Sequence, residues 1–300
     1  MKKILILLST YNGEKYLREQ LDSLLKQEDV EIHILVRDDG SKDGTIKILD
    51  EYAKKGLLTY IKGENIGWRR SFMELIYNAP KSDYYAFCDQ DDIWKPKKMV
   101  KAVGILESMP KGQPNLYCSN LIYYKNGTEF GLIRKKTPNL TLQLALMRSL
   151  SAGCTMVFNR ELRDMVVDNK PKHVTAHDFW LYQVASLLGN VYYDMNSYIL
   201  YRQHSENQIG ASINKKSIWK KRIESARKNF MCNDRQFAAK ELLRLYSPMI
   251  TDENREIVER VAYYDRNFFS RLKLFFDRKF TMGNFTNDVW LRIKILFGKI

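Results

Sequence analysis

The chain has 300 residues, enough for one large α/β domain with an extension, and its hydrophobic content of 45% is normal for a packed core. The first apolar run, Ile4–Leu8, is far too short to span a bilayer. It leads into polar residues without a small-residue cleavage site, so we interpret it as a β-strand and not as part of a signal peptide. The four cysteines are scattered without metal or redox spacing, which is typical of a protein in a reducing cytosol.

The net charge of +14 is concentrated near the C-terminal end. Residues 213–300 contain 20 Lys and Arg against 10 Asp and Glu, so residues 1–212 carry only +4 of the total. A basic segment beside a nearly neutral body indicates an anionic binding partner for that segment. Because Phe and Leu are interleaved with the charges and no nucleic-acid-binding signature is present, acidic lipid is favoured over nucleic acid.

The first hundred residues alternate between two patterns. Three short apolar runs are typical of buried strands: Ile4–Leu8, Ile32–Val36 and Tyr84–Cys88. Apolar residues at helical spacing lie in three further segments: Leu17–Leu25, Ile46–Ala53 and Phe72–Ala79. Strands that alternate with helices predict right-handed βαβ units and a mainly parallel sheet flanked by helices.

The later residues are more mixed. Two strands, a helix and an extended segment are predicted, in this order: Leu116–Ser119, Cys154–Phe158, Phe179–Leu188 and Tyr192–Tyr201. From Ser217 onward the pattern is helical and charged. We therefore predict an α/β domain over residues 1–212 and a basic helical extension over residues 213–300. His173 and His177 are spaced to share a helix face, but no metalloprotease pattern accompanies them and we expect no zinc site there.

Polar clusters follow three of the predicted strands: Thr10–Asn12, Asp38–Ser41 and Asp89–Asp92. Ligands of parallel α/β sheets bind beyond the carboxyl ends of the strands, so these loops are expected to converge on one binding edge. The carboxylates of Asp89, Asp91 and Asp92 repel one another unless a cation or a network of donors neutralises them. Mg²⁺ or Mn²⁺ does this with oxygen ligands while it bridges a diphosphate. The alternative is a solvated acidic turn that caps the helix starting near Pro96.

Asp38 and Asp39 also end a strand, and two interpretations of them stay open. In the first, they cap the helix of a strand-to-helix turn, a common arrangement. In the second, one carboxylate accepts the N3–H of a pyrimidine base. Both hold together if one side chain caps while its neighbour faces the ligand.

Four segments, in order, carry a resemblance to a known family: Leu8–Gly13, Arg37–Ser41, Asn65–Gly67 and Asp89–Trp94. Together they resemble the family 2 glycosyltransferases, which have the GT-A fold and invert the anomeric centre. Further segments are similar to the branch of bacterial rhamnosyltransferases: Phe87–Trp94, Gly153–Met156, His177–Trp180 and Tyr201–His204. The resemblance covers about residues 1–212, and it implies a GT-A type, Rossmann-like α/β domain.

The resemblance also implies the donor site. Residues that match the nucleotide-sugar site of the family are Ser9, Tyr11, Asp39, Asn65, Asp89 and Gln90. Among these, Ser9, Tyr11 and Asp39 are expected to line the nucleoside pocket, and Asp39 to accept the N3–H of the base. Asp91 is expected to bind Mn²⁺ or Mg²⁺ directly, with Asp89 and His204 as further metal-binding candidates.

Asp178 falls where the family keeps its catalytic base, which takes the proton of the acceptor hydroxyl during inverting attack. Its alternative interpretation is an N-cap of the helix over Phe179–Leu188. Two departures from the family pattern concern the surroundings. Trp68-Arg69-Arg70 stands where a small residue is usual, and Tyr201–His204 replaces the Gln-x-x-Arg-Trp of processive members.

The function implied is transfer of a sugar, with L-rhamnose from dTDP-rhamnose as the best match and a UDP-hexose as the alternative. The implied acceptor is a hydroxyl of a lipid-linked or saccharide molecule in bacterial cell-surface polysaccharide synthesis. A pyrophosphorylase-type nucleotidyltransferase is less consistent, because the loop after the first strand lacks the Gly-rich, basic sequence of that class. A nucleic-acid-binding protein or a non-catalytic sugar-binding scaffold are the alternatives from other classes.

The segment Phe268–Phe276 has the pattern of an interfacial helix. At 100° per residue, five apolar side chains share one stripe: Phe268, Phe269, Leu272, Phe275 and Phe276. Basic residues lie outside the stripe, which is typical of a helix on an anionic membrane surface. We therefore expect a cytoplasmic protein held peripherally at the inner face of the cell membrane. The alternative is a stripe that packs on the α/β domain or on a second subunit of a homodimer.

Overall fold

The computed structural model describes residues 1–172, 174–204 and 233–300, and these form two compact units. The first unit comprises residues 1–138, 150–170 and 176–202, and the second comprises residues 139–149 and 171–175 and the chain from Gln203. The predicted boundary after residue 212 lies outside the described residues. No helix in the described part of the chain is long and apolar enough to cross a bilayer.

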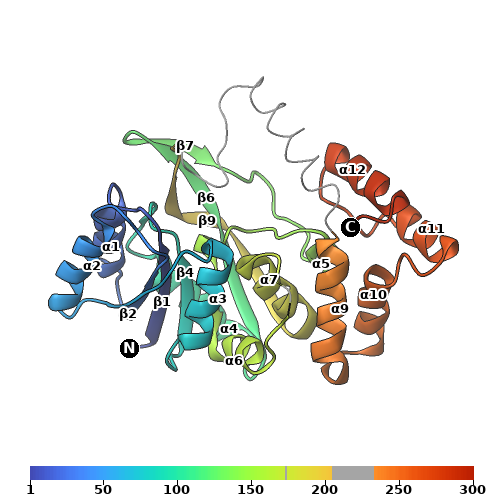
Figure 1. The fold of residues 1–300 in the computed structure, drawn as a ribbon, viewed down its shortest axis with the longest axis horizontal. Helices are drawn as coiled ribbons and strands as arrows, with labels where there is room; N and C mark the ends of the chain where they lie inside the picture. Colours follow the sequence, from blue (N-terminus) through green and yellow to red (C-terminus); the bar gives the residue numbers. More distant parts are fainter. Residues whose placement is uncertain (173, 205–232) are drawn as a thin grey trace. The chain divides into compact units, whose positions relative to one another are not determined.

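The first unit is built on a mixed, nine-stranded sheet (Figure 1). Its order is β3-β2-β1-β4-β8-β6-β9-β5, and β7 pairs with β6 outside this path. The strands are β1 (Lys3–Thr10), β2 (Glu31–Asp38), β3 (Thr59–Lys62), β4 (Tyr84–Cys88), β5 (Ile93–Trp94), β6 (Asn115–Lys125), β7 (Thr128–Leu132), β8 (Val157–Asn159) and β9 (Asn190–Arg202). The strands predicted in the first hundred residues are confirmed.

The first half of the sheet is parallel. β1 pairs in parallel with β2 and with β4, and Leu8 lies opposite both Val36 and Cys88. The apolar run of β1 is fully buried because helices cover both faces of the sheet. The carboxyl ends of β1, β2 and β4 therefore lie side by side, as the alternating pattern predicted.

The second half of the sheet is mixed. β8 runs antiparallel to both β4 and β6, whereas β6 pairs in parallel with β9. The strand predicted over Cys154–Phe158 begins only at Val157, because a 3-10 turn over Gly153–Thr155 precedes it. β5 pairs with β9, with Trp94 opposite Ile199, and this pairing ties the chain after β4 to the end of the first unit.

Six α-helices accompany this sheet: α1 (Leu17–Leu25), α2 (Thr45–Lys54), α3 (Trp68–Asn78), α4 (Lys98–Ser108), α6 (Arg160–Asp168) and α7 (His177–Leu188). α3, α6 and α7 pack against one another (Figure 1). A single core joins every second residue of β1 to the apolar faces of α1, α2 and α4. The mixed sheet flanked by helices is the expected α/β architecture.

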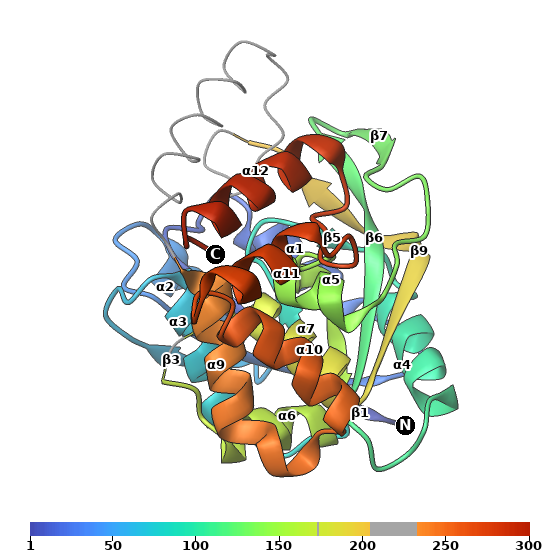
Figure 2. The ribbon, with the colours of Figure 1, turned by 90° about the vertical axis from the view of Figure 1, so that its right-hand side faces the viewer.

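The second unit is helical in the described residues, as the sequence predicted for the C-terminal extension. Its helices are α5 (Leu142–Met147), α9 (Asp234–Tyr246), α10 (Asp252–Ala262), α11 (Phe268–Phe276) and α12 (Phe285–Leu296). α9 packs along α10, and α11 packs along α12 (Figure 2).

Candidate active site

The loops that follow β1 and β4 are joined by a reciprocal pair of hydrogen bonds. The backbone N–H of Tyr11 donates to Oε1 of Gln90 at 2.8 Å, and Nε2 of Gln90 donates to the carbonyl of Tyr11 at 3.1 Å. The N–H of Asn12 donates to Oγ of Ser41 at 2.9 Å, which adds the loop after β2. The three polar clusters predicted to converge on one edge are therefore in contact. A Cβ on Gly13 would lie 2.4 Å from Oε1 of Gln90, so a larger residue here would displace the Gln90 amide from Tyr11.

Asp38 holds the turn after β2. Its carboxylate accepts hydrogen bonds from the hydroxyl of Thr10 at 3.0 Å and from the N–H groups of Gly40 and Ser41 at 3.1 and 2.9 Å. The next helix, α2, begins only at Thr45. The helix-capping interpretation is therefore wrong for Asp38. Its carboxylate instead stabilises the turn, because it accepts hydrogen bonds from the N–H groups of Gly40 and Ser41.

Asp39 is buried and organises the segment before α3. Its carboxylate accepts hydrogen bonds from the guanidinium of Arg37 and from the N–H groups of Ile66 and Gly67, the last two at 3.0 and 2.9 Å. Arg37 also donates to Oγ of Ser71 at 3.1 Å. A carboxylate has about four acceptor positions, and three of those of Asp39 are occupied.

Two further residues of the predicted donor site lie around Asp39. Oγ of Ser9 lies 2.7 Å from Oγ of Ser71, the residue that also binds Arg37. Asn65 is exposed, and its backbone N would lie 3.2 Å from a Cβ on Gly40, whose φ of 84° is in the left-handed region. The segment that contains Asn65 therefore packs directly on the turn after β2, beside Asp39.

Residues Asp89–Asp92, here called the acid loop, bring carboxyl groups together in a poorly solvated place. Burial raises the pKa of Asp89 to about 7, and the charges of Asp91 and Asp178 contribute to the increase. Burial also raises the pKa of Asp92 well above its ordinary value, and Asp91 and Asp89 add to this. Such repulsion is relieved by a divalent cation, and carboxylate oxygens are the ligands that Mg²⁺ and Mn²⁺ prefer, so these residues fit a metal ion.

Cys154 lies beneath the acid loop, although cysteine spacing along the sequence gave no sign of it. Its Sγ and carboxylate oxygens of Asp89 and Asp92 all lie within 4.8 Å of one another. Burial raises the pKa of the Cys154 thiol well above its ordinary value, so the sulfur is protonated and behaves as a small buried group. The 3-10 turn that carries Cys154 packs on β4, and only this long-range contact reveals the neighbourhood.

Arg202 fixes the acid loop from the end of β9. Its Nε donates to the carbonyl of Asp91 at 2.8 Å, and its backbone N–H donates to Oδ1 of Asp92 at 3.1 Å. The guanidinium also reaches Glu19 at 2.5 Å. Arg202 lies in the segment Tyr201–His204 but had no predicted role, because Asp91 and Asp92 are about 110 residues away in the chain.

Asp178 is the second residue of α7 and lies beside the acid loop, since its charge contributes to the raised pKa of Asp89. Burial raises the pKa of Asp178 to about 6, whereas hydrogen bonds from backbone N–H groups and the charge of Arg69 oppose the increase. The N-cap of α7 is Ala176, and Asp178 accepts a hydrogen bond from the N–H of Phe179, at 2.8 Å, inside the first turn. The N-cap interpretation of Asp178 is therefore wrong, and Arg69, at the start of α3, is a neighbour that the sequence did not suggest.

His177 is packed in an aromatic box. Its ring stacks on Phe72 at a centroid distance of 4.1 Å and meets the rings of Phe87 and Trp68 edge-on at 4.6 and 5.7 Å. Burial lowers the pKa of His177 to about 3, so the ring is neutral. This packing holds the first turn of α7 and with it the side chain of Asp178. The other histidine of the pair, His173, lies outside the described residues.

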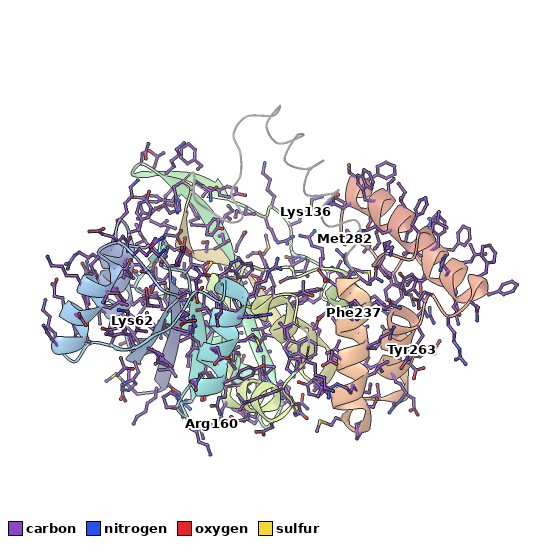
Figure 3. The ribbon with its side chains drawn as sticks, viewed as in Figure 1. Lys62, Lys136, Arg160, Phe237, Tyr263 and Met282 are labelled. Atoms are coloured by element: carbon purple, nitrogen blue, oxygen red, sulfur yellow. The ribbon has the colours of Figure 1, made fainter. Side chains whose placement is uncertain are left out.

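His204 belongs to the second unit, and its metal-binding role stays a prediction. A cavity of about 270 Å³ opens at the opposite edge of the sheet, where β1, β4 and β6 begin. Its lining includes Arg160, labelled in Figure 3, and none of the predicted site residues. The candidate site is therefore the loop cluster at the carboxyl ends of the strands.

Residues 5–189 match the model of a family described as glycosyl transferase family 2. The dTDP-rhamnosyl transferase RfbG of Shigella flexneri is 32% identical over 228 residues, which cover 71% of this chain and 77% of that protein. The chain belongs to glycosyl transferase family 2. This membership makes it a glycosyltransferase, as expected, and not a nucleotidyltransferase. The matched residues include Asp39, the acid loop and Asp178.

Other similar proteins agree with the family and the fold. An uncharacterized glycosyltransferase of Rickettsia typhi is 28% identical over 220 residues, or 70% of this chain and 66% of that protein. S. aureus TarS 1–349, solved in complex with UDP-GlcNAc, superimposes with a TM-score of 0.58 at 16% identity, over 98% of this chain and 81% of that one. The mannosyltransferase PcManGT of Pyrobaculum calidifontis, in complex with GDP-Man and Mn²⁺, gives 0.55 at 15% identity, over 100% and 88%. The expected GT-A type fold is confirmed.

Proposed function

We propose that this glycosyltransferase moves L-rhamnose from dTDP-rhamnose to an acceptor hydroxyl, with inversion at the anomeric carbon. The similarity to a dTDP-rhamnosyl transferase supports the donor. A UDP-hexose is the second candidate donor, because TarS has the same fold and binds UDP-GlcNAc. The position of Asp178 beside the acid loop is the main support for its proposed role as the catalytic base.

The nucleoside is proposed to lie over the loops after β1 and β2. Asp39 has one acceptor position left after its three hydrogen bonds, and the N3–H of thymine or uracil is a donor that suits it. Tyr11 is exposed beside this position, and Ser9 and Asn65 border it. Since both bases carry the N3–H, the proposed contact suits either pyrimidine and does not distinguish thymine from uracil.

The diphosphate is proposed to lie at the acid loop. Asp91 would hold Mn²⁺ or Mg²⁺ directly, with Asp89 and His204 as the other ligands. When bound, the ion supplies positive charge that stabilises the leaving diphosphate. Gln90 contributes by fixing the acid loop to the backbone of Tyr11, which keeps the carboxylates in place.

Asp178 is proposed to be the catalytic base. Its carboxylate removes the proton from the acceptor hydroxyl as that oxygen forms a bond to the anomeric carbon. The bond between this carbon and the diphosphate oxygen breaks on the opposite face, and its electron pair leaves with the diphosphate. A pKa of about 6 leaves Asp178 mostly ionised at pH 7 and still basic enough to accept a proton.

The acceptor is proposed to be a lipid-linked or saccharide molecule of a cell-surface polysaccharide. We further propose that the protein acts at the cytoplasmic face of the membrane, where the basic residues of the second unit would meet anionic lipid. The division into a catalytic domain over residues 1–212 and an extension over residues 213–300 is part of the same proposal.

Donor turnover tests the proposed function. The purified protein is incubated with Mn²⁺ and, in parallel, with dTDP-rhamnose, UDP-glucose, UDP-GlcNAc and GDP-mannose, and the released nucleoside diphosphate is measured. We expect dTDP-rhamnose to be consumed at least about tenfold faster than the others, a factor worth about 1.4 kcal/mol. The Asp178→Asn protein is the control for contaminating hydrolases. A preference for a UDP-hexose would refute the rhamnose assignment.

A further inference from the structure

The outer faces of α11 and α12 expose an unusual number of aromatic side chains. Six of them, here called the aromatic surface, have 48–84% of their area exposed: Phe268, Phe269, Phe276, Phe285, Trp290 and Phe297. Side chains project outward along both helices in Figure 3. Phenylalanine is normally buried, and a contiguous apolar patch on a protein marks a site that another surface covers.

The aromatic surface is not an incomplete core, because both helices already have buried faces within the second unit. Leu274 of α11 and Leu291 and Ile295 of α12 are fully or almost fully buried. Leu274 is not a member of the apolar stripe and faces the core, whereas Phe268, Phe269 and Phe276 of the stripe are exposed.

The two helices are also fixed to each other. Arg292 of α12 donates to the carbonyls of Leu274, Asp277 and Phe280 at 3.0, 3.0 and 2.8 Å. The side chains of Asn267 and Asn284 cap the two helices. The aromatic surface is therefore formed before anything binds to it, and little ordering opposes binding.

The charge around the aromatic surface identifies the kind of partner. Residues 268–300 contain seven Lys and Arg against two Asp. Both aspartates already have partners within the protein. Asp277 forms an ion pair with Arg260 at 2.7 Å, and Asp288 accepts a hydrogen bond from the hydroxyl of Thr281. In the described part of the chain, no carboxylate pairs with the exposed Lys273 or Lys279, the latter next to the exposed Arg278.

A net charge of +5 on this segment disfavours a symmetric dimer through the same face, because two like-charged surfaces would meet. Aromatic rings surrounded by lysine and arginine are instead the composition of an interfacial membrane helix. The rings enter the boundary between headgroups and acyl chains, while the basic groups remain at the level of the lipid phosphates.

We propose that the aromatic surface of α11 and α12, with Lys273, Arg278 and Lys279, binds the interface of an anionic phospholipid bilayer. Its use, to bring the active site to a lipid-linked acceptor, rests on the proposed function. The binding itself does not, and it is measured without any sugar donor.

The test is flotation of the full-length protein with vesicles of phosphatidylcholine alone or mixed with phosphatidylglycerol, at low and high salt. We expect flotation with the anionic vesicles at low salt, and its loss with neutral vesicles or at high salt. Lys273→Gln combined with Lys279→Gln should lower binding roughly fivefold for each residue, which is about 1 kcal/mol each. Phe269→Ser and Phe285→Ser should each lower it on the order of tenfold.

Matched controls distinguish binding through the aromatic surface from non-specific binding of the protein to vesicles. Phe130 of β7 is as exposed as Phe268, and Lys101 of α4 is an exposed lysine, so Phe130→Ser and Lys101→Gln should float like the unchanged protein. Melting temperatures of all variants confirm that they fold. Release of nucleotide from soluble donor should not change in the variants, so loss of binding and loss of activity are separable.

Three outcomes overturn the proposal. The first is that the full-length protein does not float with anionic vesicles at low salt. The second is equal flotation of the aromatic-surface variants and their controls. A dimer in sedimentation that Phe269→Ser converts to a monomer, without any vesicle binding, would identify the face as a contact between two copies of the chain and would also overturn it.

Discussion

Arg202→Lys is expected to loosen the acid loop while it keeps the positive charge. The arginine donates from Nε to the carbonyl of Asp91 at 2.8 Å and pairs with Glu19 at 2.5 Å. Its guanidinium also lies 4.7 and 5.2 Å from the ring centroids of Tyr16 and Tyr124. Lysine has no planar fork, so it loses the Nε contact and the stacking on both rings.

The magnitude follows from these contacts. The hydrogen bond from a charged group to the Asp91 carbonyl contributes about 1.5–3 kcal/mol. The two ring contacts contribute about 0.5–1 kcal/mol each, and the half-exposed Glu19 pair adds little. Of these contacts, only the one with Asp91 affects the orientation of the carboxylates that we propose bind the metal, so the Mn²⁺ concentration that gives half-maximal activity should rise roughly 10- to 100-fold.

The assay is nucleotide release during a Mn²⁺ titration, with melting temperature measured in parallel. Arg134→Lys is the matched control, because Arg134 likewise donates to a carbonyl, that of Leu150, at 2.7 Å and lies 5.7 Å from the ring of Tyr193. Both variants should melt earlier, but only Arg202→Lys should need more Mn²⁺. A half-saturating Mn²⁺ concentration within twofold of the original, or an equal rise in both variants, would contradict a positioning role for Arg202.

Three further outcomes are expected at the same site. Asp91→Asn should nearly abolish transfer with the fold intact, because an amide lacks the charge that holds the cation; full activity in EDTA would exclude a metal role. Asp178→Asn should lower kcat by about 10²–10⁴ with donor affinity unchanged in a binding titration, and loss of binding as well would make Asp178 structural. In a pH series, kcat should fall about tenfold between pH 7 and pH 5, because the base works only when ionised and its pKa is about 6 in place of 3.8. A flat profile down to pH 5 would show that burial does not perturb Asp178 during turnover.

The secondary structure of the first hundred residues was largely predictable because its longer strands and helices carry a local signal. The spacing of apolar residues alone predicted the buried strand β1 and the helix α1. The alternation of strands and helices also predicted that the loops after β1, β2 and β4 converge. The parallel half of the sheet follows from that alternation. The position of β8 between β4 and β6 does not, because the local pattern that predicts a strand near Val157 does not specify the strands with which it pairs.

The candidate site was predictable in its acids but not in their surroundings. Asp89, Asp91 and Asp178 stood out because they follow a strand or open a helix in matching segments. Cys154 and Arg202 reach the acid loop through pairings between distant strands, which leave no local trace in the sequence. Likewise, the side chains that share the outer face of α11 were visible from spacing, whereas the inward role of a residue such as Leu274 required the structure.

The pairing of β5 with β9 has a consequence for the order in which the protein is made. Asp92 receives a hydrogen bond from Arg202, 110 residues later in the chain, and Trp94 pairs with Ile199. At about 5–20 residues per second, a ribosome takes roughly 5–20 s to add that stretch. During this interval the growing chain has β1, β2 and β4 but no strand to hold the acid loop. The candidate active site is therefore completed only when the last strand emerges, after most of the sheet has been synthesised.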